Sequence, residues 1–169
     1  MESHTVSGGA DLEIIRDLFR EYSEQVGVDL CFQGFAAELA GLPGDYAAPS
    51  GTLILGLEAE AAAGCVAVRR WDASACEMKR LYVRPAHQGA GVGRYLAERA
   101  ILWAASSGYR RVLLDTLPSM ERAQRLYERL GFRDAGAYRP NPVPGVRYMS
   151  LDIETRMITA ENAENAERL

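Results

Sequence analysis

Three absences limit what this chain can be. Its 169 residues contain only three cysteines, Cys31, Cys65 and Cys76, an odd number without a C-x-x-C pair. We expect no secretory leader, and no apolar run in the sequence is long enough to span a bilayer. Together these absences predict a reduced, cytoplasmic protein whose thiols are buried.

Metal-ligand residues and excess basic charge are missing as well. The two histidines, His4 and His87, belong to no cluster of ligand-type residues. No Ser-His-Asp grouping can be read from the sequence. The net charge of −4 gives no argument for nucleic acid or an anionic membrane as a partner, and neither is expected.

What the chain does contain is a glycine loop. Residues 88–93 read Gln-Gly-Ala-Gly-Val-Gly, between a strand-like run over residues 77–83 and an amphipathic helix that ends near Ser107. Glycines let the backbone turn tightly, and the helix start adds unsatisfied N–H donors and the positive end of its dipole. Such a loop can hold a phosphate or diphosphate, although a plain strand-to-helix turn would also use glycines.

The spacing excludes two common phosphate-binding motifs. The dinucleotide fingerprint G-x-G-x-x-G fails because its sixth residue is Arg94 when counted from Gly89 and Leu96 when counted from Gly91. A P-loop fails because Gly93 is followed by Arg94 and Tyr95, not by Lys and Ser or Thr. A generic nucleotide-binding protein is therefore disfavoured, and the pattern that remains is Gln-x-x-Gly-x-Gly.

The other segments predict strands and helices in mixed order. We expect strands over residues 4–7, 52–58, 64–70, 77–83, 112–117 and 147–153. We expect helices over residues 11–22 and 32–40, from the glycine loop to about residue 107, and over residues 119–130. Asp11 and Ser119 are the expected N-caps of the first and last helices. This order favours an α+β domain over residues 1–153, followed by a charged, alanine-rich tail over residues 154–169.

Two segments resemble the GNAT acetyltransferases. The first contains MKRLYVRP over residues 78–85 and the glycine loop to Arg94, and the second is AQRLYERLGF over residues 123–132. Their order and separation match the strand, loop, helix, strand, helix core of that family. The resemblance extends from about Thr52 to Ile153. It implies a GNAT-like acyl-CoA N-acyltransferase fold, an α+β domain with a central mixed, mostly antiparallel sheet flanked by helices.

The resemblance implies acetyl-CoA as the acyl donor and no metal. In the family, backbone N–H groups of the glycine loop hold the pyrophosphate, and the pantetheine arm pairs with the preceding strand as an added strand would. The cofactor-binding residues that it implies are Leu81, Tyr82, Val83, Gln88, Gly89, Ala90, Gly91, Val92, Gly93 and Arg94. One departure is Met120, which stands where many members have Asn, so any contact made by that Asn is in doubt.

Acetyl transfer to an amine poses two proton problems. An alkylammonium has a pKa of about 10.4, so roughly one molecule in a thousand is neutral at pH 7, and the departing thiolate gains from a proton. Tyr127 matches the family Tyr whose hydroxyl lies near the coenzyme sulfur, although it also lies on an apolar helix stripe. Glu77 is a candidate general base. Its alternatives are a solvated strand end, an ion pair with Lys79 or Arg80, or a water chain as the base.

The resemblance therefore predicts an N-acetyltransferase that moves the acetyl group directly to a primary amine of a small molecule or peptide. A non-catalytic acyl-CoA-binding or sensor module on the same fold is the alternative, and a homodimer is compatible with either. The sequence does not identify the acceptor. Candidate acceptor-site residues from the first helices and the last hairpin are Tyr22, Tyr46, Trp71, Tyr138, Asn141 and Arg147.

Overall fold

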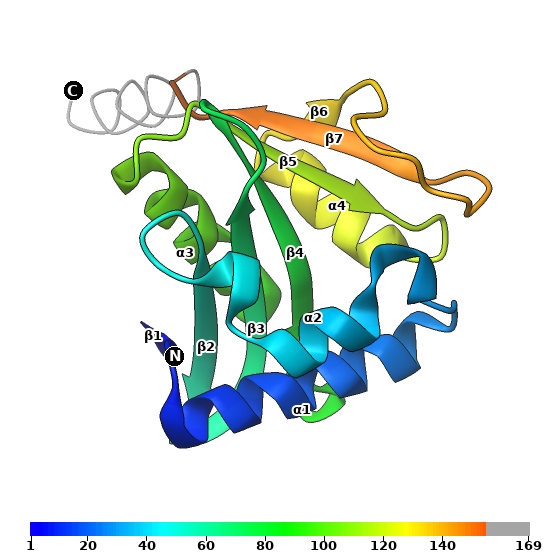
Figure 1. Cartoon of the computed structure of the whole chain (residues 1–169). Helices are drawn as coiled ribbons and strands as arrows, with labels where there is room; N and C mark the ends of the chain where they lie inside the picture. The colour runs from blue at the N-terminus through cyan, green and yellow to red at the C-terminus, as the bar shows by residue number, and fades with distance from the viewer. Residues whose placement is uncertain (155–169) are drawn as a thin grey trace, which may run out of the picture.

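The computed structural model describes residues 1–154, apart from the side chain of Phe32, and shows one seven-stranded sheet with helices on both faces (Figure 1). The strands are β1 (Glu2–Thr5), β2 (Thr52–Glu58), β3 (Ala61–Arg70), β4 (Ala75–Val83), β5 (Arg111–Thr116), β6 (Arg133–Asp134) and β7 (Arg147–Asp152). The helices are α1 (Gly9–Val26), α2 (Phe35–Gly41), α3 (Val92–Ser106) and α4 (Glu121–Arg129), with the short 3-10 turns η1 (Cys31–Gln33), η2 (Gly44–Tyr46) and η3 (Pro85–His87). Apart from its first residue, the expected tail over residues 154–169 lies outside the described residues.

The sheet is antiparallel at every junction except one. The strand order is β1-β2-β3-β4-β5-β7-β6, and β4 and β5 run parallel. Their pairing is confined to three register positions, the last joining Glu77 to Leu113. Beyond Glu77 the two strands diverge (Figure 1), so the rest of β4 presents a backbone edge that β5 does not cover. The expected α+β fold with a mixed, mostly antiparallel sheet is confirmed, and the divergence creates space for a site.

Two apolar clusters fix the helices on the sheet. The face covered by α3 and α4 buries the predicted stripe of α3, which consists of Leu96, Ala97, Ala100, Ile101 and Ala104. The opposite face is covered by α1 and α2, with Ile15, Leu18 and Phe19 of α1 fully buried. Burying apolar surface on both faces of a sheet is the usual way for such a domain to form its core.

Several expected element ends are wrong. Asp11 lies inside the first turn of α1, whose N-cap is Gly8, and its carboxylate contacts His4 Nε2 at 2.8 Å. Helix α4 has Met120 as its N-cap, not Ser119. Strand β3 begins at Ala61 because the turn before it consists of Ala59 and Glu60, both with positive φ. A two-residue turn of this kind normally uses Asn or Gly, so the residue types at these two positions do not indicate a turn.

The cysteines divide into two environments. Cys65 and Cys76 are buried as expected, and burial raises the pKa of the Cys76 thiol to about 12. Cys31 is exposed, so the prediction that all three thiols are buried is wrong for it. This residue begins a short 3-10 turn ahead of α2, outside both apolar clusters. Within residues 1–154, no helix has both the length and the apolar character needed to cross a membrane.

Candidate active site

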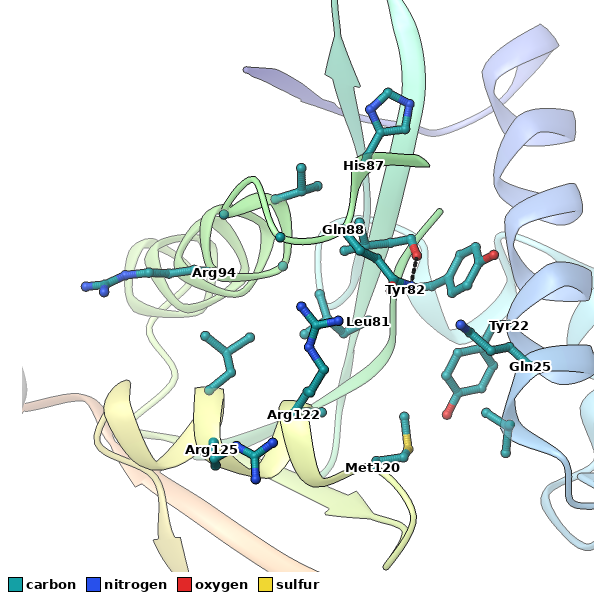
Figure 2. Close-up of a pocket in the computed structure, with 18 of the residues that line it drawn as sticks. Tyr22, Gln25, Leu81, Tyr82, His87, Gln88, Arg94, Met120, Arg122 and Arg125 are labelled. Atoms are coloured by element: carbon teal, nitrogen blue, oxygen red, sulfur yellow. Dashed lines mark hydrogen bonds between the residues drawn. The ribbon is translucent and has the colours of Figure 1, made fainter. Parts of the chain in front are cut away.

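A cleft of about 750 Å³ lies where β4 and β5 diverge. Figure 2 shows Tyr22 and Gln25 of α1 on one side of it and Arg94 of α3 on the other. Nine of the ten residues expected to hold the cofactor line this cleft: Leu81, Tyr82, Val83, Gln88, Gly89, Gly91, Val92, Gly93 and Arg94. Ala90, the tenth, is not among the lining residues. The structure therefore brings almost the whole predicted cofactor set around one space.

The glycine loop has the backbone shape that its sequence predicts. Gly89 and Gly91 have φ of 83° and 82°, a region that residues with a side chain rarely adopt. Gly91 is the N-cap of α3, and no side chain caps the helix. The N–H groups of the first helical turn therefore have no intrahelical acceptor and can receive an anion. Gln88 Nε2 donates to the carbonyl of Val83 at 3.1 Å, which ties the loop to the end of β4.

Helix α4 adds positive charge that sequence reasoning missed. Arg122, Arg125 and Arg129 line the cleft together with Arg94. Figure 2 shows Arg122 extending from α4 toward the glycine loop. The spacing of three and four residues that places these arginines on one helix face was a readable signal. N–H donors and guanidinium groups suit a ligand with several phosphates, so the residues present fit coenzyme A.

A second, smaller cavity of about 30 Å³ adjoins the cleft. The two spaces share Tyr22, Leu81 and Met120 as lining residues. The small cavity is otherwise lined by Gln33, Met78, Lys79, Arg80, Asp115, Thr116 and Tyr127. Its volume suffices for about two water molecules or a group of a few heavy atoms.

Tyr127 borders this small cavity. Its ring packs against Phe132 with centroids 5.7 Å apart, and the residue is 7% exposed. Burial raises the pKa of its hydroxyl, which therefore stays protonated at neutral pH. No group within residues 1–154 forms a hydrogen bond with that hydroxyl. The position is compatible with a proton donor, and that role stays a prediction.

Glu77 is in a different environment from the one expected. It is completely buried, so the alternative of a solvated strand end is wrong. One carboxylate oxygen accepts from Arg69 Nε at 2.8 Å and from Arg139 Nη2 at 2.6 Å, and the other accepts from the Tyr138 hydroxyl at 2.6 Å. Arg69 lies directly opposite Glu77 in the register of β3 and β4. Neither space is lined by Glu77, so its role as a base stays a prediction that this geometry does not favour.

A bulge in β4 directs two consecutive cations toward η1 and α2. The register slips between Cys65 and Ala67 of β3, and Arg80 on the facing strand has a φ of 57°. Lys79 Nζ donates to Gln33 Oε1 at 3.1 Å, and Arg80 Nε donates to Glu38 Oε2 at 2.8 Å. In a regular strand neighbouring side chains point to opposite faces, so the bulge explains why both line the small cavity.

The remaining candidate acceptor residues separate into two groups. Tyr138 bonds to Glu77, Trp71 packs edge-on against Tyr138 at 5.0 Å, and Asn141 Nδ2 donates to Asp115 at 3.2 Å. Tyr46 is instead a core residue whose hydroxyl donates to Glu38, and Arg147 pairs with Asp134 and Glu128 on the outer surface.

His87 lines the cleft and pairs with Glu58 at 2.6 Å. Within the described residues, no group of three metal-ligand side chains is placed to hold an ion.

Comparison with known proteins gives a consistent result. Residues 12–132 match the model of the acetyltransferase (GNAT) family. An uncharacterized N-acetyltransferase of Schizosaccharomyces pombe is 39% identical over 145 residues, which cover 85% of this chain and 89% of that protein. The N-acetylaspartate synthetase of Danio rerio is 27% identical over 133 residues, which cover 78% of this chain and 47% of that protein.

A solved structure supports the same fold. A protein from Salmonella typhimurium, determined with its cofactor acetyl-CoA, has a TM-score of 0.63 and 20% identity over 89% of this chain and 94% of its own. At that identity the likeness is evidence for the fold. The family match over residues 12–132 and the 39% identical relative establish that the chain belongs to the GNAT family and is an N-acetyltransferase.

Proposed function

We propose that this chain transfers the acetyl group of acetyl-CoA directly to the primary amine of a small molecule or peptide. The observation that carries the proposal is the meeting of two spaces between β4 and β5. The cleft gathers nine of the ten expected cofactor residues, and the small cavity holds Tyr127. The two spaces share three lining residues, Tyr22, Leu81 and Met120, which supports adjoining sites for donor and acceptor.

Residues of the cleft bind and orient the donor, whose thioester supplies the activated acetyl group. The N–H groups of the glycine loop bind the diphosphate, and the arginines of α4 neutralise phosphate charge. The free edge of β4 from Leu81 to Val83 accepts the pantetheine arm as an added strand. Met120 offers no amide here, so it contributes only apolar contact.

Residues of the small cavity move protons. The Tyr127 hydroxyl is protonated at neutral pH and donates its proton to the departing sulfur. Because every oxygen of Glu77 already accepts a hydrogen bond, we assign it to positioning Tyr138 and Arg139. The proton of the acceptor ammonium then leaves through water.

The acceptor is a primary amine in this proposal. One relative is named N-acetylaspartate synthetase, and that name supports including amino acids among the amines tested. A non-catalytic acyl-CoA-binding module would use the same glycine loop, but it would not require a protonated hydroxyl such as that of Tyr127 in the small cavity.

The test is release of free coenzyme A thiol from acetyl-CoA with a panel of amines, each product checked by mass. Coenzyme A at a hundred times its dissociation constant should also raise the free energy of unfolding by about 2.7 kcal/mol, with or without a chelator. A panel that gives no acetylated product would refute the transferase proposal. Absence of stabilisation by coenzyme A, or its loss with chelator, would refute the cofactor assignment.

A further inference from the structure

The chain has one lysine beside eighteen arginines, and that lysine is buried in the small cavity. Lys79 is 6% exposed and lines the same space as Tyr127. An ammonium group taken out of water is costly unless a counter-charge or several hydrogen bonds replace the solvent. The partners of Lys79 therefore indicate what the cavity is built to receive.

The neighbouring cations, buried Arg80 and half-buried Arg69 and Arg139, all have carboxylate partners. Arg80 forms two hydrogen bonds with Glu38, at 2.8 and 3.2 Å. Arg69 and Arg139 share the carboxylate of Glu77. Lys79 differs from them, because its Nζ donates to the neutral amide oxygen of Gln33 at 3.1 Å and forms no ion pair with a carboxylate among residues 1–154.

The environment of Lys79 disfavours its charged form. Burial is the main reason that the pKa of Lys79 is lowered to about 8, although the charge of Glu77 acts in the opposite direction. An anion placed against Nζ would reverse this effect, because a nearby opposite charge favours the charged form. Lys79 thus presents to the small cavity an ammonium group whose charge is only partly neutralised.

A second polar group in the cavity also lacks a partner. Thr116 is 4% exposed, and its hydroxyl oxygen is buried without a hydrogen-bond partner among the described residues. It lines the same cavity as Lys79. Buried hydroxyls are normally satisfied, so an unpaired one in a cavity wall indicates a missing ligand atom or water. An ammonium and a hydroxyl are two donors that suit the oxygens of a carboxylate.

The cavity also contains a carboxylate of its own. Asp115 lines it, and one of its oxygens accepts from Asn141 Nδ2 at 3.2 Å. The small cavity is therefore lined by a cation that can donate further hydrogen bonds (Lys79), a hydroxyl without a partner among the described residues (Thr116) and an anion (Asp115). This combination is complementary to a molecule that carries both an anionic and a cationic group.

We propose that the acceptor is an amine that also carries a carboxylate, as free amino acids do, and that Lys79 and Thr116 bind this carboxylate. The inference rests on the proposed transferase function and specifies its substrate class. The carboxylate occupies the small cavity, and the amine lies toward Tyr127 and Asp115. A polyamine is disfavoured because its second ammonium would meet Lys79 without a counter-charge.

The first test compares acceptors that differ in one group. The twenty free amino acids, their α-amides and spermidine are assayed with acetyl-CoA by thiol release. For the best amino acids, kcat/KM should exceed that of the matched amide by at least about tenfold, which corresponds to one good interaction with a charged group. Lys79→Gln should remove the preference, mainly by raising KM for the acid. Thr116→Val, which keeps the side-chain shape, should weaken the preference.

A matched control is available on α1. Arg20 is an exposed cation that pairs with Asp17 and is not among the lining residues, and Arg20→Gln removes one positive charge outside the cavity. This variant should retain the acid preference. Thermal melts of all variants establish that each is folded before kinetics are compared.

The single lysine allows a second test that does not depend on turnover. With ¹³C-labelled lysine the protein gives one ε-carbon signal, assigned by its loss in Lys79→Gln. In the complex with coenzyme A, a preferred amino acid should raise the pKa read from this signal, whereas its amide should not.

The outcomes separate the two proposals. Equal kcat/KM for acids and amides, or an unmoved lysine signal in the presence of a preferred amino acid, would overturn the carboxylate site. An equal loss of kcat for acids and amides in Lys79→Gln would overturn it as well, because that result would make Lys79 the base. Preferential acetylation of amides or spermidine would refute the carboxylate site but leave the transferase function standing. No acetylation of any amine, with coenzyme A still bound, would refute the transferase function and this inference with it.

Discussion

The side chain of Tyr127 combines a packed ring with an unpartnered hydroxyl, and the two can be separated by mutation. Tyr127→Phe keeps the contact with Phe132 and should leave the melting temperature and coenzyme A affinity nearly unchanged. If the hydroxyl protonates the departing sulfur, kcat should fall by about 10²-fold or more. Thiol release at saturating substrates measures the effect.

Tyr109→Phe provides the control for losing a tyrosine hydroxyl elsewhere. The Tyr109 hydroxyl donates to the carbonyl of Ser50 at 2.7 Å, and the residue is not among those that line the two spaces. This variant should keep kcat. A Tyr127→Phe enzyme with near-normal kcat would leave Tyr127 only its packing role.

Glu77 is expected to matter chiefly for stability. Glu77→Gln leaves Arg69 and Arg139 without their shared counter-charge in a largely buried setting. Breaking a buried pair by removing one partner costs about 3 to 5 kcal/mol, and the residual exposure of the arginines reduces this to about 2 to 4 kcal/mol. Urea unfolding measures the loss, with the exposed Asp17→Asn as a control that should change stability little. If Glu77→Gln instead leaves the stability unchanged but strongly lowers kcat/KM, that result would support the base role.

At the scale of elements, the glycine loop is the decisive part of the proposed cofactor site. Gly91 has a φ of 82° and open space where a Cβ would lie, so the strain of Gly91→Val is conformational and does not arise from packing. Coenzyme A and dephospho-coenzyme A should bind much more weakly to this variant, because a branched side chain obstructs the approach of the diphosphate. Pantetheine, which lacks the diphosphate, should bind as before. Calorimetric titration of the three ligands is the measurement.

Gly108 supplies a matched control for this substitution. It has a φ of 85°, equally open space, and a position after the far end of α3. Gly108→Val should therefore cost about the same stability, roughly 1 to 3 kcal/mol, while leaving coenzyme A affinity intact. Equal losses of pantetheine and coenzyme A affinity in Gly91→Val would show that the loop is not the diphosphate site.

The elements also show which parts of the fold were predictable. The apolar stripe of α3 and the strands around it were identified because hydrophobic periodicity reports burial directly. The beginnings of α1 and α4 were placed wrongly because Gly8 and Met120 act as N-caps without a side-chain hydrogen bond. A cap without a capping side chain leaves little trace in the sequence.

For the whole molecule, the two halves of the site differ in how far the sequence reveals them. The proposed cofactor half is nearly continuous in sequence from Leu81 to Arg94, so a local motif and a family resemblance were enough to select residues that line one cleft. The proposed acceptor half is assembled by tertiary contacts, such as those of Lys79 with Gln33 and of Asn141 with Asp115. Such pairings depend on loop paths and on the β4 bulge, which no local pattern specified.

The buried lysine also predicts a pH dependence of the stability of the whole domain. Its pKa is about 8 in the folded protein, below the usual value of 10.5. Between these values the unfolded chain binds the proton and the folded protein does not, so this group makes stability rise with pH. Below about pH 8 both states are protonated and the full cost of burying the charge remains.

Comparison with Lys79→Met isolates this effect, because the titrations of the other groups are common to both proteins. The free energy of unfolding of the wild type should rise relative to the variant between pH 8 and 10.5, by an amount on the order of 3 kcal/mol. Urea unfolding at half-unit pH steps measures the difference. A constant difference between the two proteins across this range would mean that the Lys79 ammonium is not desolvated in the folded state, and the charge argument for the acceptor cavity would lose its basis.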